Sequence, residues 1–242
     1  MVTVMVPAFN EEAYLRSTVE SLIRSATNND VELDVIIIND GSTDRTQNII
    51  RELESEFSFI RSIDNRKNLG LGVSLKSAVK KGIGDKFLIV GGDGDLSEEG
   101  ISTLFKHMHK AEITSLYYLN KEKRGRFRNI LSTVYDTMYV LFFNIYIQYI
   151  NAACVYPMDK LKQLELNSTR FAIVAEVTVK LLRTGCTYQE YPSFMERGAD
   201  GSSAITLKNL FEVCLSFVRL IADVLIINRQ KYDHRPVRIF SK

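Results

Sequence analysis

The sequence lacks tryptophan, has only four prolines among 242 residues, and has three cysteines with no CxxC spacing. Such cysteines exclude a disulfide framework or a cysteine-based zinc site and are typical of thiols in a reducing compartment. The sequence also has no large excess of positive or negative charge, because the net charge is only +2. This balance gives no indication of nucleic-acid binding. A hydrophobic content of 45% and a charged content of 25% exclude a disordered or collagen-like chain.

The beginning of the sequence shows no targeting segment. Residues 1–6 have no basic stretch and reach Pro7 too soon for a signal peptide. We therefore expect a cytoplasmic protein, either free or attached to the cytosolic face of a membrane.

The first half of the sequence alternates short apolar runs with amphipathic helical patterns. The apolar runs cover residues 2–6, 35–38, 59–63, 87–90 and 113–119, and the helical patterns cover 11–26, 44–57, 71–81 and 97–110. The runs are continuously apolar, which is typical of parallel strands that are buried on both faces. The pattern predicts an α/β fold, with a mostly parallel central sheet flanked by helices.

Short polar segments follow the first four predicted strands, at residues 7–12, 39–44, 65–72 and 91–95. In open parallel sheets, ligands bind outside the carboxyl ends of the strands. The sequence therefore predicts that these segments converge on one site. The P-loop pattern GxxxxGK[ST] is absent, and no GxGxxG follows the first strand, so neither of those phosphate-binding loops is expected.

Asp93-Gly94-Asp95 is the most specific local motif. Two carboxylates one residue apart, among glycines, can bind Mg²⁺ or Mn²⁺ together with phosphate oxygens, and such a metal would neutralise a diphosphate leaving group. The alternative is an acidic turn, in which glycine supplies a positive φ. Position after a buried strand favours the metal site.

Three other acidic residues follow predicted strands. Asp40 ends the second strand, where a carboxylate can accept hydrogen bonds from a nucleotide base or ribose. Asp44 is better explained as a helix cap, with Gln47 three residues later. Glu11 could face the cleft, whereas Glu12 fits the first turn of a helix, where acids complement the helix dipole.

The second half contains a basic run and two long apolar stretches. Residues 121–128 hold five basic residues and one acid, which is typical of a solvated loop or an anion-binding segment. Residues 130–150 carry one charge, Asp136, and their polar positions fall on one side, which predicts a wide-faced amphipathic helix or two helices with a bend. Residues 206–228 behave similarly, with Glu212 and Asp223 on one charged stripe. Both helices would pack on the domain, on a second subunit as a homodimer, or at a membrane surface.

The four polar segments resemble the successive motifs of family-2 glycosyltransferases of the GT-A fold, over roughly residues 1–120: Val6–Glu12, Ile38–Asp44, Asn68–Gly70 and Asp93–Asp95. The resemblance implies a UDP- or GDP-sugar donor, Mg²⁺ or Mn²⁺, and inversion at the anomeric carbon. It implies metal binding by Asp93 and Asp95. The nucleotide-binding residues that it implies are Pro7, Ala8, Phe9, Glu11, Asp40, Gly70 and Asp93.

Within that family the chain is most similar to the polyprenol-phosphate branch, which resembles dolichol-phosphate mannose synthase. Arg128–Ser132 matches an RxxxS feature, Glu176 with Gly185–Pro192 matches a helix–Gly–strand segment, and Arg197–Ser203 resembles RxxGxS. The chain departs from this branch at Asn151–Cys154, where members of the branch usually have an Asp followed by a turn.

This similarity implies a polyprenyl-phosphate acceptor at the cytosolic membrane face, with Arg128 as a catalytic residue beside Asp93 and Asp95. A phosphate monoester is already anionic near neutral pH, so it needs cations rather than a strong base. The implied acceptor-binding residues are Arg124, Arg126, Arg128, Ser132, Glu176, Arg197 and Ser202. Two alternatives stay open: transfer to a glycan hydroxyl, and a non-catalytic nucleotide-sugar-binding protein.

The resemblance also implies a domain organisation. Residues 1–204 would form the GT-A domain, with a nucleotide-sugar-binding half (1–120) and an acceptor half (121–204). Residues 205–242 would add an amphipathic helix and a basic tail.

Overall fold

The structure is a computed structural model that describes residues 1–123, 125–196 and 207–240. The strands are β1 (Val2–Ala8), β2 (Leu33–Asn39), β3 (Ile60–Asp64), β4 (Lys86–Ile89), β5 (Ile113–Tyr118), β6 (Cys154–Pro157), β7 (Thr187–Ser193) and β8 (Val237–Arg238). The α-helices are α1 (Leu15–Asn28), α2 (Thr46–Glu56), α3 (Leu71–Lys81), α4 (Glu98–His107), α5 (Arg126–Phe143), α6 (Met158–Lys162), α7 (Ala172–Arg183) and α8 (Leu207–Ile221). A short 3₁₀ helix, η1 (Lys121–Lys123), and a π-helix, η2 (Ala222–Ile227), complete the order.

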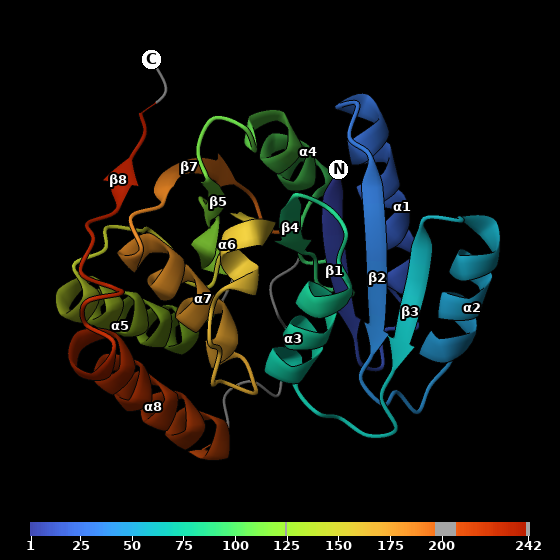
Figure 1. Cartoon of the computed structure of the whole chain (residues 1–242). Helices are drawn as coiled ribbons and strands as arrows, with labels where there is room; N and C mark the ends of the chain where they lie inside the picture. The colour runs from blue at the N-terminus through green and yellow to red at the C-terminus, as the bar shows by residue number, and fades with distance from the viewer. Residues whose placement is uncertain (124, 197–206, 241–242) are drawn as a thin grey trace.

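The described strands form one sheet in the order β3-β2-β1-β4-β6-β5-β7-β8 (Figure 1). The strand β6 is antiparallel to both of its neighbours, β4 and β5, and the other pairs are parallel. Since two reversals restore the direction, β5 and β7 run the same way as β1 to β4. The prediction of a mostly parallel α/β sheet is confirmed, and the carboxyl ends of β1, β2, β3, β4, β5 and β7 lie along one edge.

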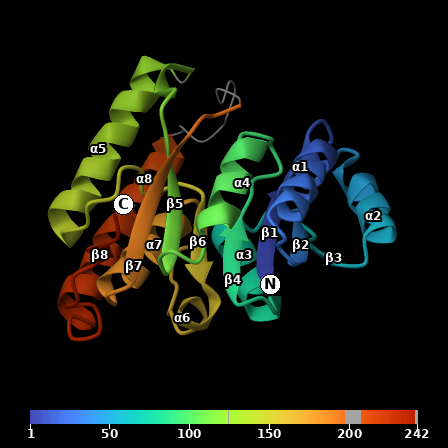
Figure 2. The ribbon, with the colours of Figure 1, turned by 90° about the horizontal axis from the view of Figure 1, so that it is seen from above.

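Alternate residues of the central strands enter two different cores. Val4 and Ile37 pack toward the helices α1, α2 and α4, which Figure 2 shows together on one side of the sheet. Met5 and Ile36 pack in the other core with residues of α3, α6 and α7. This alternation explains why the strands read as continuous apolar runs, because both faces of the sheet are covered.

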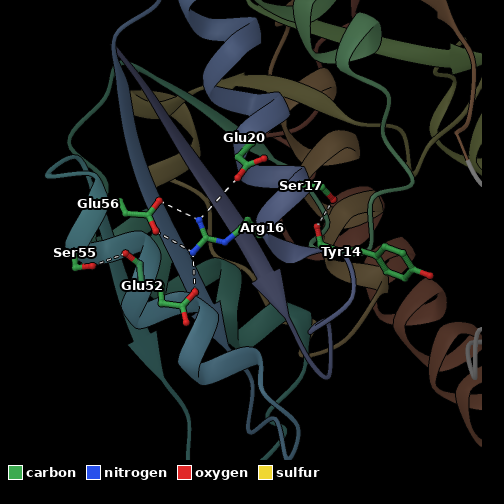
Figure 3. A network of polar contacts seen from close by, with 7 residues as sticks. All are labelled: Tyr14, Arg16, Ser17, Glu20, Glu52, Ser55 and Glu56. Carbon is green, nitrogen blue, oxygen red and sulfur yellow. Dashed lines mark hydrogen bonds and ion pairs between the residues drawn. The ribbon is translucent and has the colours of Figure 1, made fainter.

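An ion-pair cluster joins α2 to α1 at the surface (Figure 3). The Arg16 guanidinium on α1 lies 2.8 Å from a Glu52 carboxylate oxygen and 3.0 Å from one of Glu56, both on α2. Surface pairs add little free energy each, so the buried apolar contacts carry most of this packing. The Tyr14 ring, just before α1, points away from the cluster.

The predicted helix over residues 130–150 is wrong at its C-terminal end. The helix α5 ends at Phe143, because Asn144 adopts a left-handed conformation with φ of 51°, which asparagine tolerates. The following chain is held by side chains, since Asp136 Oδ1 accepts a hydrogen bond from the Ile150 backbone N–H at 3.1 Å. Within the described part of the chain, no helix is long and apolar enough to cross a membrane.

The second long amphipathic stretch forms α8 and continues into the π-helix η2. Its acidic residues contact the domain: Asp223 pairs with Lys180 of α7 at 2.6 Å, and Glu212 pairs with Arg170 at 3.1 Å. Phe217 stacks edge-to-face against Tyr139 and Phe143 of α5. The two predicted amphipathic helices therefore pack on the domain and on each other.

Candidate active site

The segments that follow β1 and β2 are bonded to each other at the carboxyl edge of the sheet. The Asn10 backbone N–H donates to Ser42 Oγ at 3.0 Å, and the Asn10 side-chain oxygen accepts from the Thr43 N–H at 2.8 Å. The Glu11 N–H donates to Thr46 Oγ1 at 2.8 Å. Asn10 has φ of 59°, a conformation in which asparagine is enriched. These bonds fix the first two of the four predicted segments side by side.

Asp40 connects the second segment to the third. Its buried carboxylate accepts hydrogen bonds from Asn65 Nδ2 at 2.9 Å, the Leu69 N–H at 2.9 Å and the Gly70 N–H at 2.8 Å. A carboxylate offers about four acceptor positions, so roughly one is left for a ligand. The structure thus gives Asp40 a role in shaping the turn, beside its predicted contact with a nucleotide.

Asp44, predicted to be structural, also binds backbone groups. Its carboxylate accepts from the Thr46 N–H at 3.0 Å and the Glu12 N–H at 3.2 Å. Partial burial opposes ionisation, yet the hydrogen bonds from Thr46 and Glu12 outweigh it and lower the pKa of Asp44. The helix α2 itself begins after Arg45, which has no side-chain capping bond; Asp44, one residue earlier, binds the N–H of the first helical residue, Thr46, and also the loop after β1 through Glu12.

The Asp93–Asp95 segment follows β4 and runs along the end of β1. The Gly92 N–H donates to the Pro7 carbonyl at 3.1 Å, which places the turn beside the last residues of β1. Asp93 is exposed and Asp95 is partly buried, and the Asp95 N–H donates to Asp93 Oδ1 at 3.2 Å. Gly94 has φ of 70°, which suits glycine.

The donor set at this turn is two carboxylates. No group of three or more His, Cys, Asp and Glu side chains that could hold a metal occurs among the residues with described placement. Mg²⁺ commonly takes only one or two carboxylates and fills its octahedron with phosphate oxygens and water. Asp93 and Asp95 therefore fit a cation that binds together with a diphosphate, and do not fit a metal held by the protein alone.

The remaining predicted nucleotide-binding residues lie at the end of β1 or in the turn that Asp40 organises. Pro7 and Ala8 are the last residues of β1, with Ala8 buried, and Phe9 follows with its side chain exposed. Gly70 is buried with φ of 91°. Tyr14 was not predicted, although a Cβ atom on Gly94 would lie 3.7 Å from Tyr14 Cβ. An aromatic residue just before the first helix was the only signal for it.

The ends of β5 and β7 meet the same turn from the second half of the chain. The Glu196 N–H donates to the Asp95 carbonyl at 3.2 Å, and Leu96 forms an antiparallel bridge with Met195. Asn120 binds Met195 twice, through its side-chain amide and its carbonyl oxygen, both at 2.9 Å. Lys123 Nζ donates to the Glu196 carbonyl at 3.3 Å. The basic run after β5 is therefore tied to the segment that contacts Asp95.

The predicted acceptor-binding residues of the basic run lie at the start of α5. Arg126 is exposed, Arg128 is partly buried, and Ser132 Oγ lies 3.5 Å from Asp136 Oδ2, at the limit of a hydrogen bond. Arg124, Arg197 and Ser202 lie outside the residues that the structure describes. Asn120 and Lys123 were not among the predicted residues, although Lys123 belongs to the basic run.

Glu176, also predicted to bind the acceptor, is buried behind the site. Its carboxylate accepts the Asn167 N–H at 2.9 Å and the Ser168 N–H at 2.8 Å, and it pairs with Lys180 at 2.8 Å. Burial alone would raise the pKa of Glu176, but these partners lower it, so the group is a carboxylate. The structure shows it holding the loop before α7, and an acceptor contact stays a prediction.

Solved structures with this fold come from several glycosyltransferases. A mannosyl-3-phosphoglycerate synthase from Rubrobacter xylanophilus superimposes with a TM-score of 0.70 at 13% identity, over 95% of this chain and 75% of that one. A glucosyl-3-phosphoglycerate synthase from Mycobacterium tuberculosis, solved with Mg²⁺ and UDP, gives a TM-score of 0.67 at 16% identity, over 92% of this chain and 79% of that one. Their likeness shows that the fold is GT-A, as predicted.

Sequence relatives cover the chain unequally. A dolichyl-phosphate beta-glucosyltransferase, ALG5D of Trichomonas vaginalis, is 28% identical over 55% of this chain. The matched part is 44% of the length of that relative, so the chain spans less than half of it. The uncharacterized protein MJ0544 of Methanocaldococcus jannaschii is 21% identical over 90% of this chain and 97% of its own length. The family model "Glycosyl transferase family 2" matches residues 3–161. Because that match covers more than half of the sequence, the chain belongs to glycosyl transferase family 2.

Proposed function

We propose that this chain transfers a sugar from a UDP- or GDP-sugar to a polyprenyl phosphate, with inversion at the anomeric carbon, at the cytosolic face of a membrane. The observation that carries the proposal is the junction of the two halves at Asp95. There the Glu196 N–H bonds to the Asp95 carbonyl, and Lys123 bonds to the Glu196 carbonyl. This junction connects the basic run, through Lys123, to the backbone of Asp95, and so supports an acceptor site next to the expected donor site.

The donor would occupy the edge formed by the ends of β1, β2 and β4. Asp93 and Asp95 would hold Mg²⁺ or Mn²⁺, which when bound stabilises negative charge on the diphosphate leaving group. Asp40 contributes by fixing the Leu69–Gly70 turn, and by the acceptor position that its three hydrogen bonds leave. The relatives solved with UDP support a nucleotide at this edge.

The acceptor's chemistry is supported by the basic residues at the start of α5. A phosphate monoester has a second pKa of about 6, so it attacks as an anion and needs charge pairing more than a general base. Arg126 and Arg128, in the first turn of α5, can bind phosphate in bidentate fashion. The similarity to dolichyl-phosphate beta-glucosyltransferases supports a lipid phosphate.

An apolar stripe on α5 supports attachment to a membrane. The stripe consists of exposed side chains at helical spacing on the face away from the core: Phe127, Ile130, Val134, Met138 and Leu141. The opposite face of α5 buries Tyr139 and Phe143 against α8. A helix with an exposed apolar stripe and basic residues at its start fits an anionic membrane surface, so the phosphate of a lipid would reach the site from the plane of its own membrane.

Donor binding is tested by isothermal titration of UDP and GDP with and without Mn²⁺. We expect Mn²⁺ to strengthen the binding of one nucleotide, and this metal-dependent binding to fall at least about tenfold in Asp95→Asn, since one of two carboxylate ligands is lost. Asp30→Asn, at an exposed turn far from this edge, is the matched control. Binding that is equal in both variants would reject the metal role of Asp95.

Acceptor identity is tested by sugar transfer to a short polyprenyl phosphate, compared with free glycans. We expect transfer to the lipid phosphate to fall about 10- to 100-fold in Arg128→Gln, as a charged hydrogen-bond partner is lost, with the exposed Arg229→Gln unchanged. Transfer to glycan hydroxyls alone would favour the second candidate acceptor. Nucleotide-sugar binding without transfer to either would favour the non-catalytic alternative.

Membrane attachment is tested by flotation with vesicles that contain anionic lipid. The double variant Ile130→Glu, Leu141→Glu places two charges in the apolar stripe and should abolish flotation without loss of folding, because both side chains are exposed. Thr133→Glu with Thr137→Glu adds the same charge beside the stripe and should reduce flotation only slightly. Wild-type protein that stays with the buffer as a stable dimer would reject the membrane surface in favour of a homodimer.

A further inference from the structure

The only lysine among the described residues whose side chain is completely buried, Lys180 of α7, links the C-terminal helix to the donor edge. Its ammonium group contacts Asp223 Oδ2 of η2 at 2.6 Å, Glu176 Oε1 at 2.8 Å and the Glu165 carbonyl. An ammonium group has three donors, and each has a partner here. Burial alone would lower the pKa of Lys180, but the two carboxylates raise it, so the group is charged.

Glu176, one of the partners of Lys180, connects Lys180 to the loop before α7. Glu176 binds the backbone N–H groups of Asn167 and Ser168, and so fixes the loop that ends at Arg170. Arg170 then pairs with Glu212 of α8 at 3.1 Å. The loop is therefore held by α8 and η2 at two points, one through Lys180 and one through Arg170.

The same loop packs directly against the turn that Asp40 organises. The Gly72 N–H donates to the Thr169 carbonyl at 2.9 Å. A Cβ atom on Gly70 would lie 2.7 Å from the Thr169 carbonyl oxygen, and one on Gly72 would lie 2.5 Å from that of Ser168. Only glycine leaves room for this packing, and the Gly72–Thr169 hydrogen bond joins the loop to the Gly70–Gly72 turn, so we expect a shift of the loop to move the turn.

We propose that Lys180 is a positioning residue of the donor site: it transmits the placement of α8 and η2, through Glu176 and residues 165–170, to the turn at Gly70. The contacts described form a continuous series from Asp223 to Asp40. The exposed apolar residues Val218, Ile226 and Ile227 lie on α8 and η2. A contact made at this surface would therefore change the affinity of the turn for the donor, and donor binding would change the strength of that contact. This effect on donor binding rests on the proposed function, whereas the mechanical link does not.

Replacing Lys180 itself would leave Glu176 and Asp223 unpaired in the interior, which is strongly destabilising. Asp223→Asn is a milder change, because the amide oxygen can still accept from Lys180 while the charge is lost. Glu212→Gln weakens the second connection independently at Arg170. Asp233→Asn is the matched control, since it removes an ion pair between the C-terminal segment and Arg183 of the same α7, away from the loop.

The first readout is hydrogen exchange of the backbone amides of Leu69, Gly70 and Gly72 in the full chain without ligand. We expect roughly threefold to thirtyfold faster exchange in Asp223→Asn and Glu212→Gln, the range of couplings carried through packed networks. Asp233→Asn should leave these amides at the wild-type rate. Unchanged rates in the first two variants, or equal acceleration in all three, would overturn the proposal.

The second readout is the dissociation constant for UDP and GDP with Mn²⁺. Asp223→Asn and Glu212→Gln should weaken binding of the preferred nucleotide by a similar roughly threefold to thirtyfold, and raise the donor KM more than they lower kcat. Faster exchange with unchanged nucleotide affinity would overturn the positioning role. A wild-type chain that binds neither nucleotide would refute the proposed function, and the exchange result would still decide whether the mechanical link exists.

Discussion

Replacing Asp40 by asparagine should destabilise the Leu69–Gly70 turn, which the donor is expected to contact. The Asp40 carboxylate is buried and accepts hydrogen bonds from Asn65, Leu69 and Gly70 at 2.8–2.9 Å. In Asp40→Asn the amide oxygen can keep the two bonds now made to Oδ1. The amide nitrogen would then face the Gly70 N–H, so that two donors oppose each other.

The cost follows from these contacts. A hydrogen bond to a charged group contributes about 1.5–3 kcal/mol, and a buried donor left without a partner costs about 1–3 kcal/mol. Relief of the buried charge offsets part of this loss. We therefore expect Asp40→Asn to lower the free energy of unfolding by about 3 kcal/mol, a large share of the roughly 5–15 kcal/mol of a typical domain.

Urea denaturation of wild type and variants measures this difference. Asp44→Asn is the internal comparison, because Asp44 is less buried than Asp40 and also binds two backbone N–H groups, and it should cost less than about 1 kcal/mol. If Asp40→Asn is no more destabilising than Asp44→Asn, Asp40 does not organise the turn. Loss of nucleotide affinity without loss of stability would instead assign Asp40 to the ligand alone.

Two further predictions concern other points of the fold. Ala normally stabilises a helix relative to Gly. Gly72→Ala should nevertheless lower the free energy of unfolding in urea by about 1–3 kcal/mol, since its Cβ would lie 2.5 Å from the Ser168 carbonyl oxygen. Gly125→Ala, with open space around it, is the control and should change stability by less than about 1 kcal/mol. Burial raises the pKa of Glu190 above 4.5, despite the Gln148 N–H and Arg238. The folded state thus favours the protonated acid, so this contribution to stability is present at low pH and is lost as pH rises through the folded pKa. Stability of wild type relative to Glu190→Gln should fall between about pH 4 and neutrality, and a parallel pair of curves would contradict this.

The sequence was sufficient for the strands that are buried on both faces. Residues 35–38 and 87–90 are continuously apolar because helices cover both sides of β2 and β4. The polar segments after them could be expected to meet, since parallel strands end at one edge. What could not be predicted is β6, four residues long, which enters antiparallel between β4 and β5. Its partners lie 39–41 positions away in β5 and 67–71 positions away in β4, so the pairing leaves no local pattern.

The candidate site was predictable in residue type and less so in role. An acid at the end of β2 indicates function or capping, and the sequence does not show that the backbone of Leu69 and Gly70 already occupies Asp40. Glu176 matched a motif, yet its oxygens hold a loop and a lysine. Only the arrangement in space shows which neighbours compete with a ligand for the same carboxylate.

This competition separates two groups among the acids that the sequence assigns to the site. Asp40 and Glu176 are buried, and their oxygens bind the chain's own N–H groups and Lys180, so their main effect is to fix the turn at Gly70. Asp93 is exposed, on the turn that follows β4. A metal-bound diphosphate needs both the buried acids and the exposed acid. The exposed carboxylate binds the cation, and the buried carboxylates fix the backbone around it beforehand, which strengthens that binding. Asp40→Asn should therefore weaken nucleotide binding both with and without Mn²⁺, whereas Asp93→Asn should weaken only the metal-dependent part. Titrations in which the two variants give the same pattern would refute this division of roles.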